Sequence, residues 1–213
     1  QAGGNIAYEF YKLGYSAYFI NSSATDLLTI DVNKTFKYQI PFAQGCNKNR
    51  DKAKSYAKEY YPIIANNIQS KMSNFSHIFF CFSMGGGTGS GITPILINTL
   101  AKRSPDITFG IICSIPELTE SAKAKHNAVT CYKEIQSITN LGNIYMIDNN
   151  NRRLDKMTLP LQQLDETFAT KLHSLLSVTS ANVKGSADES EILTVISMYG
   201  VATIADILPK EMA

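Results

Sequence analysis

Short apolar runs alternate with longer amphipathic stretches along most of the 213-residue chain. The runs are rich in β-branched and aromatic residues, which is typical of strands, and the stretches between them repeat apolar residues at helical spacing. Strands are expected at residues 16–20, 36–40, 78–82, 108–113 and 143–147. Helices are expected at residues 5–13, 51–72, 91–102, 120–138 and about 161–178, and a further helix is expected to start within 188–199.

This alternation predicts an α/β fold: a Rossmann-like, mostly parallel sheet with helices on both faces. Such sheets bind ligands at the carboxyl ends of their strands, in the loops that lead into the helices. Polar or glycine-rich groups follow the expected strands at those places. They are residues 21–23, 85–91, 114–117 and 148–150.

The most informative of these groups is Gly-Gly-Gly-Thr-Gly-Ser-Gly at residues 85–91, between a buried strand and a helix. Glycine lets backbone N–H groups approach a ligand closely, and the helix N-terminus adds positive potential, so the cluster favours a phosphate chain. Thr88 and Ser90 add hydroxyl donors. A tight turn without a ligand is the alternative. The lysine of a P-loop is missing, so the loop would have to bind phosphate through backbone dipoles and a metal ion. The GxGxxG spacing is also missing, which disfavours a dinucleotide oxidoreductase.

Composition and charge narrow the class of protein further. The chain is 44% hydrophobic and its net charge is +2, so it is globular and too weakly basic to predict direct binding to nucleic acid or to a charged membrane surface. No apolar run has the length of a membrane span. The four cysteines lack CxxC spacing and the three histidines are isolated. We therefore expect reduced thiols in a cytoplasmic protein, without a zinc site.

The glycine cluster resembles the phosphate loop of the tubulin/FtsZ family, and other loops of that family can be matched in the same order. Residues 1–5, Gln-Ala-Gly-Gly-Asn, resemble its first loop, and Asn21 stands where its second loop has an asparagine. Residues 45–50 stand at its third loop, which senses the γ-phosphate, and residues 116–120 at its fifth, which contacts the ribose. Residues 148–150 resemble the sixth loop, whose asparagine contacts the guanine.

This resemblance implies binding of GTP or GDP together with Mg²⁺. Asp165 would contact the base, because a carboxylate suits the two adjacent donors of guanine, and an ordinary exposed helix acid is the alternative. Lys48 and Arg50 are interpreted either as phosphate contacts or as solvated charges. The residues that the resemblance assigns to nucleotide binding are Gln1, Ala2, Gly3, Asn5, Asn21, Gly45, Cys46, Asn47, Gly85, Gly86, Gly87, Thr88, Gly89, Ser90, Pro116, Glu120, Asn149 and Asp165.

Acidic residues follow the last long helix, in the segment Ser-Ala-Asp-Glu-Ser-Glu at residues 186–191. On its own the segment predicts a helix start, with Ser186 as the cap and Glu189 completing a capping box. The resemblance assigns Asp188 and Glu191 as the two catalytic acids, which enter the nucleotide site of the neighbouring subunit and orient the attacking water. The two interpretations are compatible, because one helical turn would place both acids on one face.

The resemblance also implies a division into domains. We expect a GTP-binding domain at residues 1–157, a central helix with the catalytic loop at 158–187, and the beginning of a C-terminal activation domain at 188–213. The family's first strand would precede Gln1 in the middle of the sheet. We therefore expect these residues to be part of a longer protein and, taken alone, to misfold or fail to polymerise, because a missing central strand leaves backbone groups unpaired.

Within the family, the region around the third loop and the end of the chain look most like TubZ, the filament proteins of plasmids and phages. The resemblance implies a GTPase that polymerises head to tail with itself, with each active site completed between adjacent subunits. Such filaments partition or position plasmid or phage DNA, usually through a separate DNA-binding adaptor protein. The alternatives are an FtsZ-like cell-division protein and a structural regulator that binds GTP without hydrolysing it.

Overall fold

The computed structural model describes residues 1–151, 153–154, 157–178 and 188–205, and most of its strands form two parallel ladders. The larger ladder has the order β3 (His77–Ser83), β4 (Thr108–Ile115), β5 (Leu141–Asp148), β8 (Gly200–Ala202). The smaller ladder pairs β1 (Phe19–Asn21) with β2 (Lys37–Gln39). An antiparallel hairpin joins β6 (Arg153–Leu154) to β7 (Met157–Thr158). The mostly parallel α/β fold expected from the sequence is therefore confirmed.

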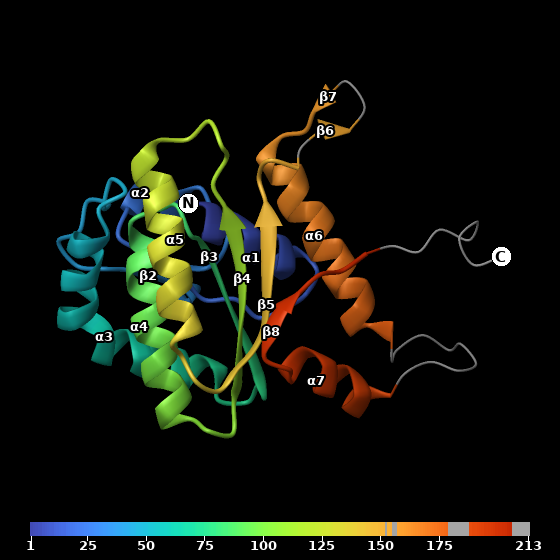
Figure 1. Cartoon of the computed structure of the whole chain (residues 1–213). Helices are drawn as coiled ribbons and strands as arrows, with labels where there is room; N and C mark the ends of the chain where they lie inside the picture. The colour runs from blue at the N-terminus through green and yellow to red at the C-terminus, as the bar shows by residue number, and fades with distance from the viewer. Residues whose placement is uncertain (152, 155–156, 179–187, 206–213) are drawn as a thin grey trace.

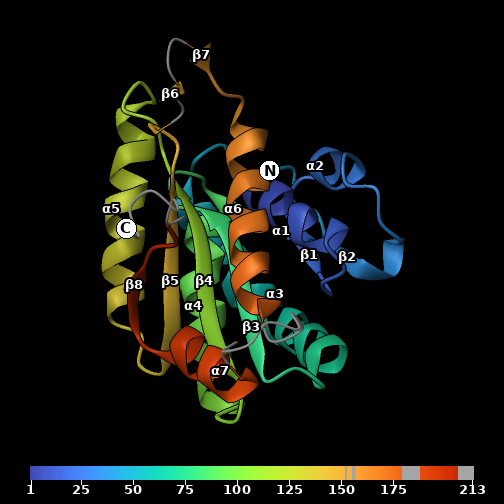
Figure 2. The ribbon, with the colours of Figure 1, turned by 90° about the vertical axis from the view of Figure 1, so that its right-hand side faces the viewer.

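Helices cover both faces of the larger ladder (Figure 1 and Figure 2). One face carries α3 (Arg50–Met72), α4 (Thr88–Arg103) and α5 (Ala122–Gln136), and the other carries α1 (Ala2–Lys12) and α6 (Leu161–Leu176). The remaining helical segments are α2 (Ala24–Leu28), a 3₁₀ turn at Lys34–Phe36, and α7 (Glu189–Ser197). None of the helices in the described part of the chain is both long enough and apolar enough to cross a membrane.

The central strands are buried on both faces, which explains why they read as continuous apolar runs. Successive side chains of a strand point to opposite faces of the sheet. Accordingly, Ile111 and Ile144 belong to the core beneath α3, α4 and α5, whereas the next residues, Ile112 and Tyr145, belong to the core beneath α1 and α6. The sheet therefore lies between two hydrophobic cores, one on each of its faces.

Most of the expected elements are present, with bounds that differ by a few residues. The first strand is shorter than expected, because only Phe19–Asn21 pairs with a neighbour. The short elements α2 and β8 were not expected. The cap predicted at Ser186 lies outside the described residues. The helix α7 begins at Glu189, and its cap is Asp188.

A cavity of about 1040 Å³ separates the two ladders, between β1 and β3. In the ladders that the structure describes, β1 pairs only with β2, and β3 pairs only with β4. One end of the cavity lies among the loops that follow β1 and β3, and residues of α7 line it as well.

The close approach of α3 and α4 at Gly91 gives a first testable prediction. A Cβ at Gly91 would lie 2.7 Å from Ala53 Cβ and 2.9 Å from the Arg50 carbonyl oxygen. Alanine favours a helix by about 1 kcal/mol over glycine, but the steric clash outweighs this gain. Gly91→Ala should therefore lower the free energy of unfolding by roughly 1–3 kcal/mol. Denaturation in urea measures this change.

The control for this variant is Asn98→Ala, at an exposed position on the same helix. It should change the free energy of unfolding by less than about 0.5 kcal/mol. A Gly91→Ala protein as stable as the parent would contradict the tight packing of α3 against α4.

Candidate functional site

The glycine-rich loop joins the end of β3 at Ser83 to the start of α4 at Thr88. Gly87 is the N-cap residue, and the first N–H groups of α4 have no carbonyl partner within the helix. A Cβ on Gly87 would lie 2.8 Å from Cys46 Cβ and 2.9 Å from the Asn49 nitrogen, so a side chain would not fit there. The loop thus combines close-packed backbone with the positive end of a helix, an arrangement suited to an anion.

The cavity between β1 and β3 reaches this loop and brings together many of the residues expected to contact phosphate. These residues come from the start of α1, the loop after β1, the loop before α3 and the glycine-rich loop. Gly3 packs so closely on the Cys81 carbonyl group of β3 that no side chain would fit. The expected residues that line the cavity are Gln1, Ala2, Gly3, Asn21, Gly45, Cys46, Asn47, Gly86, Gly87, Thr88 and Gly89.

Ser22 is the residue that links three of these loops. It is fully buried, and its hydroxyl lies 2.6 Å from the Thr88 hydroxyl and 3.6 Å from the Cys46 thiol. Its carbonyl oxygen accepts a hydrogen bond from the Gly45 N–H at 2.8 Å. The sequence placed Ser22 in the polar group after a strand, but nothing in its neighbours distinguished it from Asn21.

Three other residues expected to bind the nucleotide lie near these loops but do not line the cavity. Gly85 packs closely against Pro116: a Cβ added to Gly85 would lie only 3.0 Å from Pro116 Cβ. Ser90 is fully buried, and its hydroxyl donates back to the Gly86 carbonyl oxygen. Asn5 lies in the first turns of α1. Of the two hydroxyl residues in the loop, Thr88 is therefore the one at the cavity.

The loops after β4 and β5 are bonded to each other and to the loop before α3. The Asn150 amide donates to the Pro116 carbonyl oxygen at 3.3 Å, and the Glu120 carboxylate pairs with the Lys48 ammonium at 2.7 Å. Asn149 is buried. Pro116, Glu120 and Asn149 do not line the cavity, but their loops leave the same edge of the sheet as the glycine-rich loop, because the three strands are parallel.

Arg50 is buried, so the interpretation of it as a solvated charge is wrong. It is 8% exposed, donates to the Ser90 carbonyl oxygen at 2.7 Å and pairs with Glu134 at 2.5 Å. Lys54 pairs with the other oxygen of Glu134 at 2.6 Å. These bonds connect the N-terminal turns of α3 and α4 to α5.

Asp165 is 5% exposed, so the alternative of an ordinary exposed acid is wrong. Burial, and to a smaller extent the negative charge of Glu9 on α1, raise the pKa of Asp165 to about 7. Glu9 is itself buried and pairs with Lys12. The Asp165 carboxyl group can therefore gain or lose its charge near neutral pH.

Asp188 and Glu191 form a reciprocal capping box at the start of α7. The Asp188 carboxylate accepts from the Glu191 N–H at 2.9 Å, and the Glu191 carboxylate accepts from the Asp188 N–H at 3.0 Å. The hydroxyl of Ser190 and the Glu191 N–H both lower the pKa of Asp188. Both acids are exposed, and their reciprocal hydrogen bonds orient them at the surface.

These two acids lie at the opposite end of the sheet from the glycine-rich loop (Figure 1). The helix α7 packs against the amino ends of the strands, where the Ser197 hydroxyl lies 2.7 Å from His77 Nε2 and the Asn143 amide donates to the Met198 carbonyl oxygen at 2.6 Å. The glycine-rich loop leaves the carboxyl end of β3. Residues of α7, Glu189 among them, line the other end of the cavity, but Asp188 and Glu191 do not. A single chain therefore does not bring these two acids to its own glycine-rich loop.

The side chains at the cavity suit a metal ion that arrives with a phosphate chain. Within the described ranges, no group of three or more His, Cys, Asp and Glu side chains is placed to hold a metal ion. Oxygen-bearing side chains of Asn21, Asp26 and Thr88 do line the cavity. Mg²⁺ prefers oxygen ligands and takes many of them from phosphate and water, so this donor set fits Mg²⁺ bound with a nucleotide.

Known proteins are similar to this chain in both sequence and fold. The tubulin-like protein TubZ of Clostridium botulinum C phage is 34% identical over 216 residues, which cover 99% of this chain and 58% of that protein. The crystal structure of Clostridium botulinum phage c-st TubZ matches with a TM-score of 0.82 at 33% identity, over 93% of this chain and 63% of that one. The chain thus spans less than two thirds of these relatives.

A more distant structure shows the same fold. It is the GTPγS-form protofilament of Bacillus thuringiensis serovar israelensis TubZ, with a TM-score of 0.78 at 16% identity, over 94% of this chain and 61% of that one. Residues 1–153 of the present chain match the GTPase domain of the tubulin/FtsZ family. This match covers most of the chain, and it includes the loops that meet at the cavity. The chain belongs to the tubulin/FtsZ family.

Proposed function

We propose that this chain binds GTP and GDP with their phosphates at the glycine-rich loop. The observation that supports this most directly is the convergence of four chain segments on one cavity at the N-terminus of α4. Backbone N–H groups and a helix end can bind phosphate without the lysine of a P-loop. Lys48 also lines the cavity and adds a cation near the same place.

The roles of the other residues follow from their places around this loop. In the proposal, Pro116 and Glu120 contact the ribose, and Asn149 and Asp165 contact the guanine. Those of the expected nucleotide-binding residues that line the cavity contact the phosphates. Mg²⁺, held near Thr88 and the phosphate oxygens, would neutralise the charge that develops on those oxygens. The domain limits 1–157, 158–187 and 188–213 remain part of this proposal.

Hydrolysis in this proposal depends on a second subunit. Asp188 and Glu191 are exposed and cap α7, which lies at the opposite end of the sheet from the glycine-rich loop. A head-to-tail contact would bring them to the nucleotide of the next subunit, where they would orient the attacking water. A contact of that kind does not close on itself, so it generates a filament. The TubZ structure that is a GTPγS-form protofilament supports the assembly into filaments.

The cellular role that we propose is the partition or positioning of plasmid or phage DNA by such filaments. The net charge of +2 is too small for direct binding of DNA, so a separate DNA-binding adaptor would connect filament and cargo. One observation favours a second candidate, a regulator that binds GTP without hydrolysing it. The capping box alone is a sufficient structural reason for both Asp188 and Glu191.

Measuring GTP hydrolysis against the concentration of the intact protein separates these two functions. Turnover per subunit should rise above a critical concentration, and light scattering should rise at the same concentration, because each site needs a neighbour. Asp188→Ala should still scatter light but lose hydrolysis by at least about 100-fold. The exposed Asp106→Ala serves as the control and should behave as the parent protein does.

Turnover that is independent of concentration would contradict a site shared between subunits. Binding of GTP with no turnover at any concentration would favour the regulator.

The buried carboxyl group of Asp165 gives a prediction about pH. Guanine donors need the ionised carboxylate, and a pKa of about 7 means that its ionised fraction rises about tenfold between pH 6 and pH 8. GDP should therefore bind roughly tenfold more tightly at pH 8 than at pH 6, as equilibrium titration would measure. Asp165→Asn should remove most of this pH dependence, and Asp106→Asn should retain it.

If Asp165→Asn showed the same pH dependence as the parent, Asp165 would not be the group that contacts the base.

A further inference from the structure

One buried side chain holds the glycine-rich loop and the loop before α3 together, and that side chain is Asn127. It lies on α5 and is 4% exposed. Its amide nitrogen lies 2.9 Å from the Lys48 carbonyl oxygen and 3.2 Å from each of the Gly85 and Gly86 carbonyl oxygens. Asn127 therefore joins two loops that lie about 40 and 80 residues away from it in sequence.

The chemistry of the contact fixes which end of the amide faces the loops. Carbonyl oxygens only accept hydrogen bonds, so the NH₂ group of Asn127 must point at them. Two N–H hydrogens are shared among three acceptors. If the side chain were removed or its donors were lost, buried carbonyl groups of the loop would lose their partner, which is unfavourable.

This contact has a consequence for the neighbouring N–H groups of the loop. In a trans peptide the carbonyl of one residue and the N–H of the next point in opposite directions, and the described chain has no cis peptide. Because the Gly85 and Gly86 carbonyls point at Asn127, the N–H groups of Gly86 and Gly87 point away from it. Gly86 and Gly87 both line the cavity, as does Gly89.

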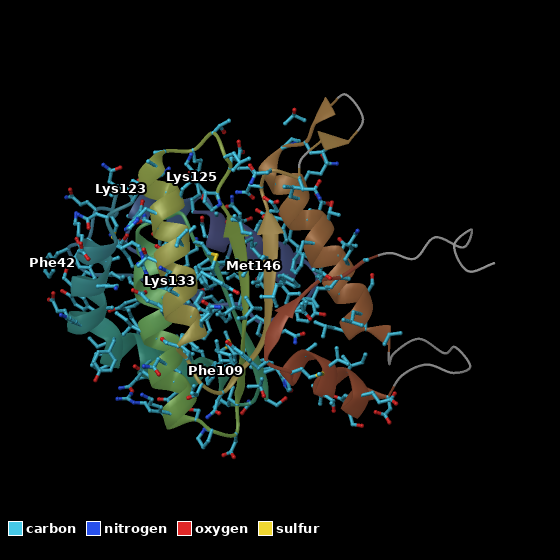
Figure 3. All side chains as sticks on the ribbon, in the orientation of Figure 1. Phe42, Phe109, Lys123, Lys125, Lys133 and Met146 are labelled. Atoms are coloured by element: carbon cyan, nitrogen blue, oxygen red, sulfur yellow. The ribbon has the colours of Figure 1, made fainter. Side chains whose placement is uncertain are left out.

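The rest of the inner face of α5 supports this arrangement. Glu134, about two turns beyond Asn127, accepts from Arg50 and Lys54 on α3, and Arg50 donates to the Ser90 carbonyl oxygen of α4. The outer face of α5 carries lysines instead, among them Lys133 (Figure 3). The buried face of α5 is thus bonded to the N-terminal regions of both α3 and α4, next to the loops that Asn127 holds.

We propose that Asn127 is a positioning residue for phosphate binding, which orients the N–H groups of Gly86 and Gly87 toward the cavity and fixes the loop before α3 beside them. The inference rests on the proposed binding of a guanine nucleotide. Preorganised donors bind an anion more tightly, because they need no rearrangement when the ligand arrives. Asn127 acts through the backbone and does not itself touch the phosphates.

The test compares Asn127→Asp with Asn143→Asp in the intact protein. Both parent residues are buried asparagines that donate to a backbone carbonyl group, but Asn143 bonds to Met198 at the other end of the sheet. Each substitution keeps the side-chain shape and replaces the NH₂ donors with an oxygen that repels the carbonyl groups. Affinities for GDP and for guanosine are measured by equilibrium titration, with melting temperatures recorded in parallel.

Asn127→Asp should weaken binding of GDP by at least about tenfold and leave the affinity for guanosine within about twofold, because guanosine has no phosphate. Asn143→Asp should lower the melting temperature to a similar extent without changing the affinity for GDP. Equal losses for GDP and guanosine, or the same loss in both variants, would show that Asn127 has only a structural role. If the parent protein bound no GDP at all, the proposed function itself would fail.

Discussion

The parallel direction of β3, β4 and β5 is the constraint on which the rest of the structure depends. Parallel strands place all of their carboxyl ends at one edge of the sheet, so the loops that follow them meet there although they are distant in sequence. The same constraint places the amino ends at the other edge, where α7 presents Asp188 and Glu191. The glycine-rich loop and the two acids are therefore at opposite ends of the sheet, and the proposed mechanism uses a second subunit to bring them together.

The glycine-rich loop is held in shape by close packing and by buried hydrogen bonds. Gly87 leaves no room for a side chain, so the loop packs directly on Cys46 and Asn49. Ser22 bonds to the hydroxyl of Thr88 from one side, and Asn127 bonds to the carbonyls of Gly85 and Gly86 from the other. Because these bonds use buried polar groups, the orientation of the backbone is costly to change.

The sequence predicted the central strands and long helices well, because continuous apolar runs and helical periodicity are local signals. It did not predict β8, since Gly200–Ala202 is too short to show a pattern. The start of α7 was ambiguous, because Ser186 with Glu189 and Asp188 with Glu191 fit the same capping spacing. Ser22 and Asn127 could not be identified, because their partners lie 66 residues away for Ser22 and 41 to 79 residues away for Asn127. The burial of Asp165 was likewise decided by packing against α1 rather than by its neighbours in sequence.

Mixing two defective variants tests the shared active site most directly. Gly87→Ala should damage the phosphate loop, because the added methyl group collides with Cys46, but it keeps Asp188. Asp188→Ala keeps the loop but lacks the acid, so each variant alone should hydrolyse little GTP. The account predicts that the mixture hydrolyses GTP faster than the sum of the two variants, because intact loops then meet intact acids across the interface. A mixture no more active than that sum, while Asp188→Ala still binds GTP and both variants enter filaments, would contradict it.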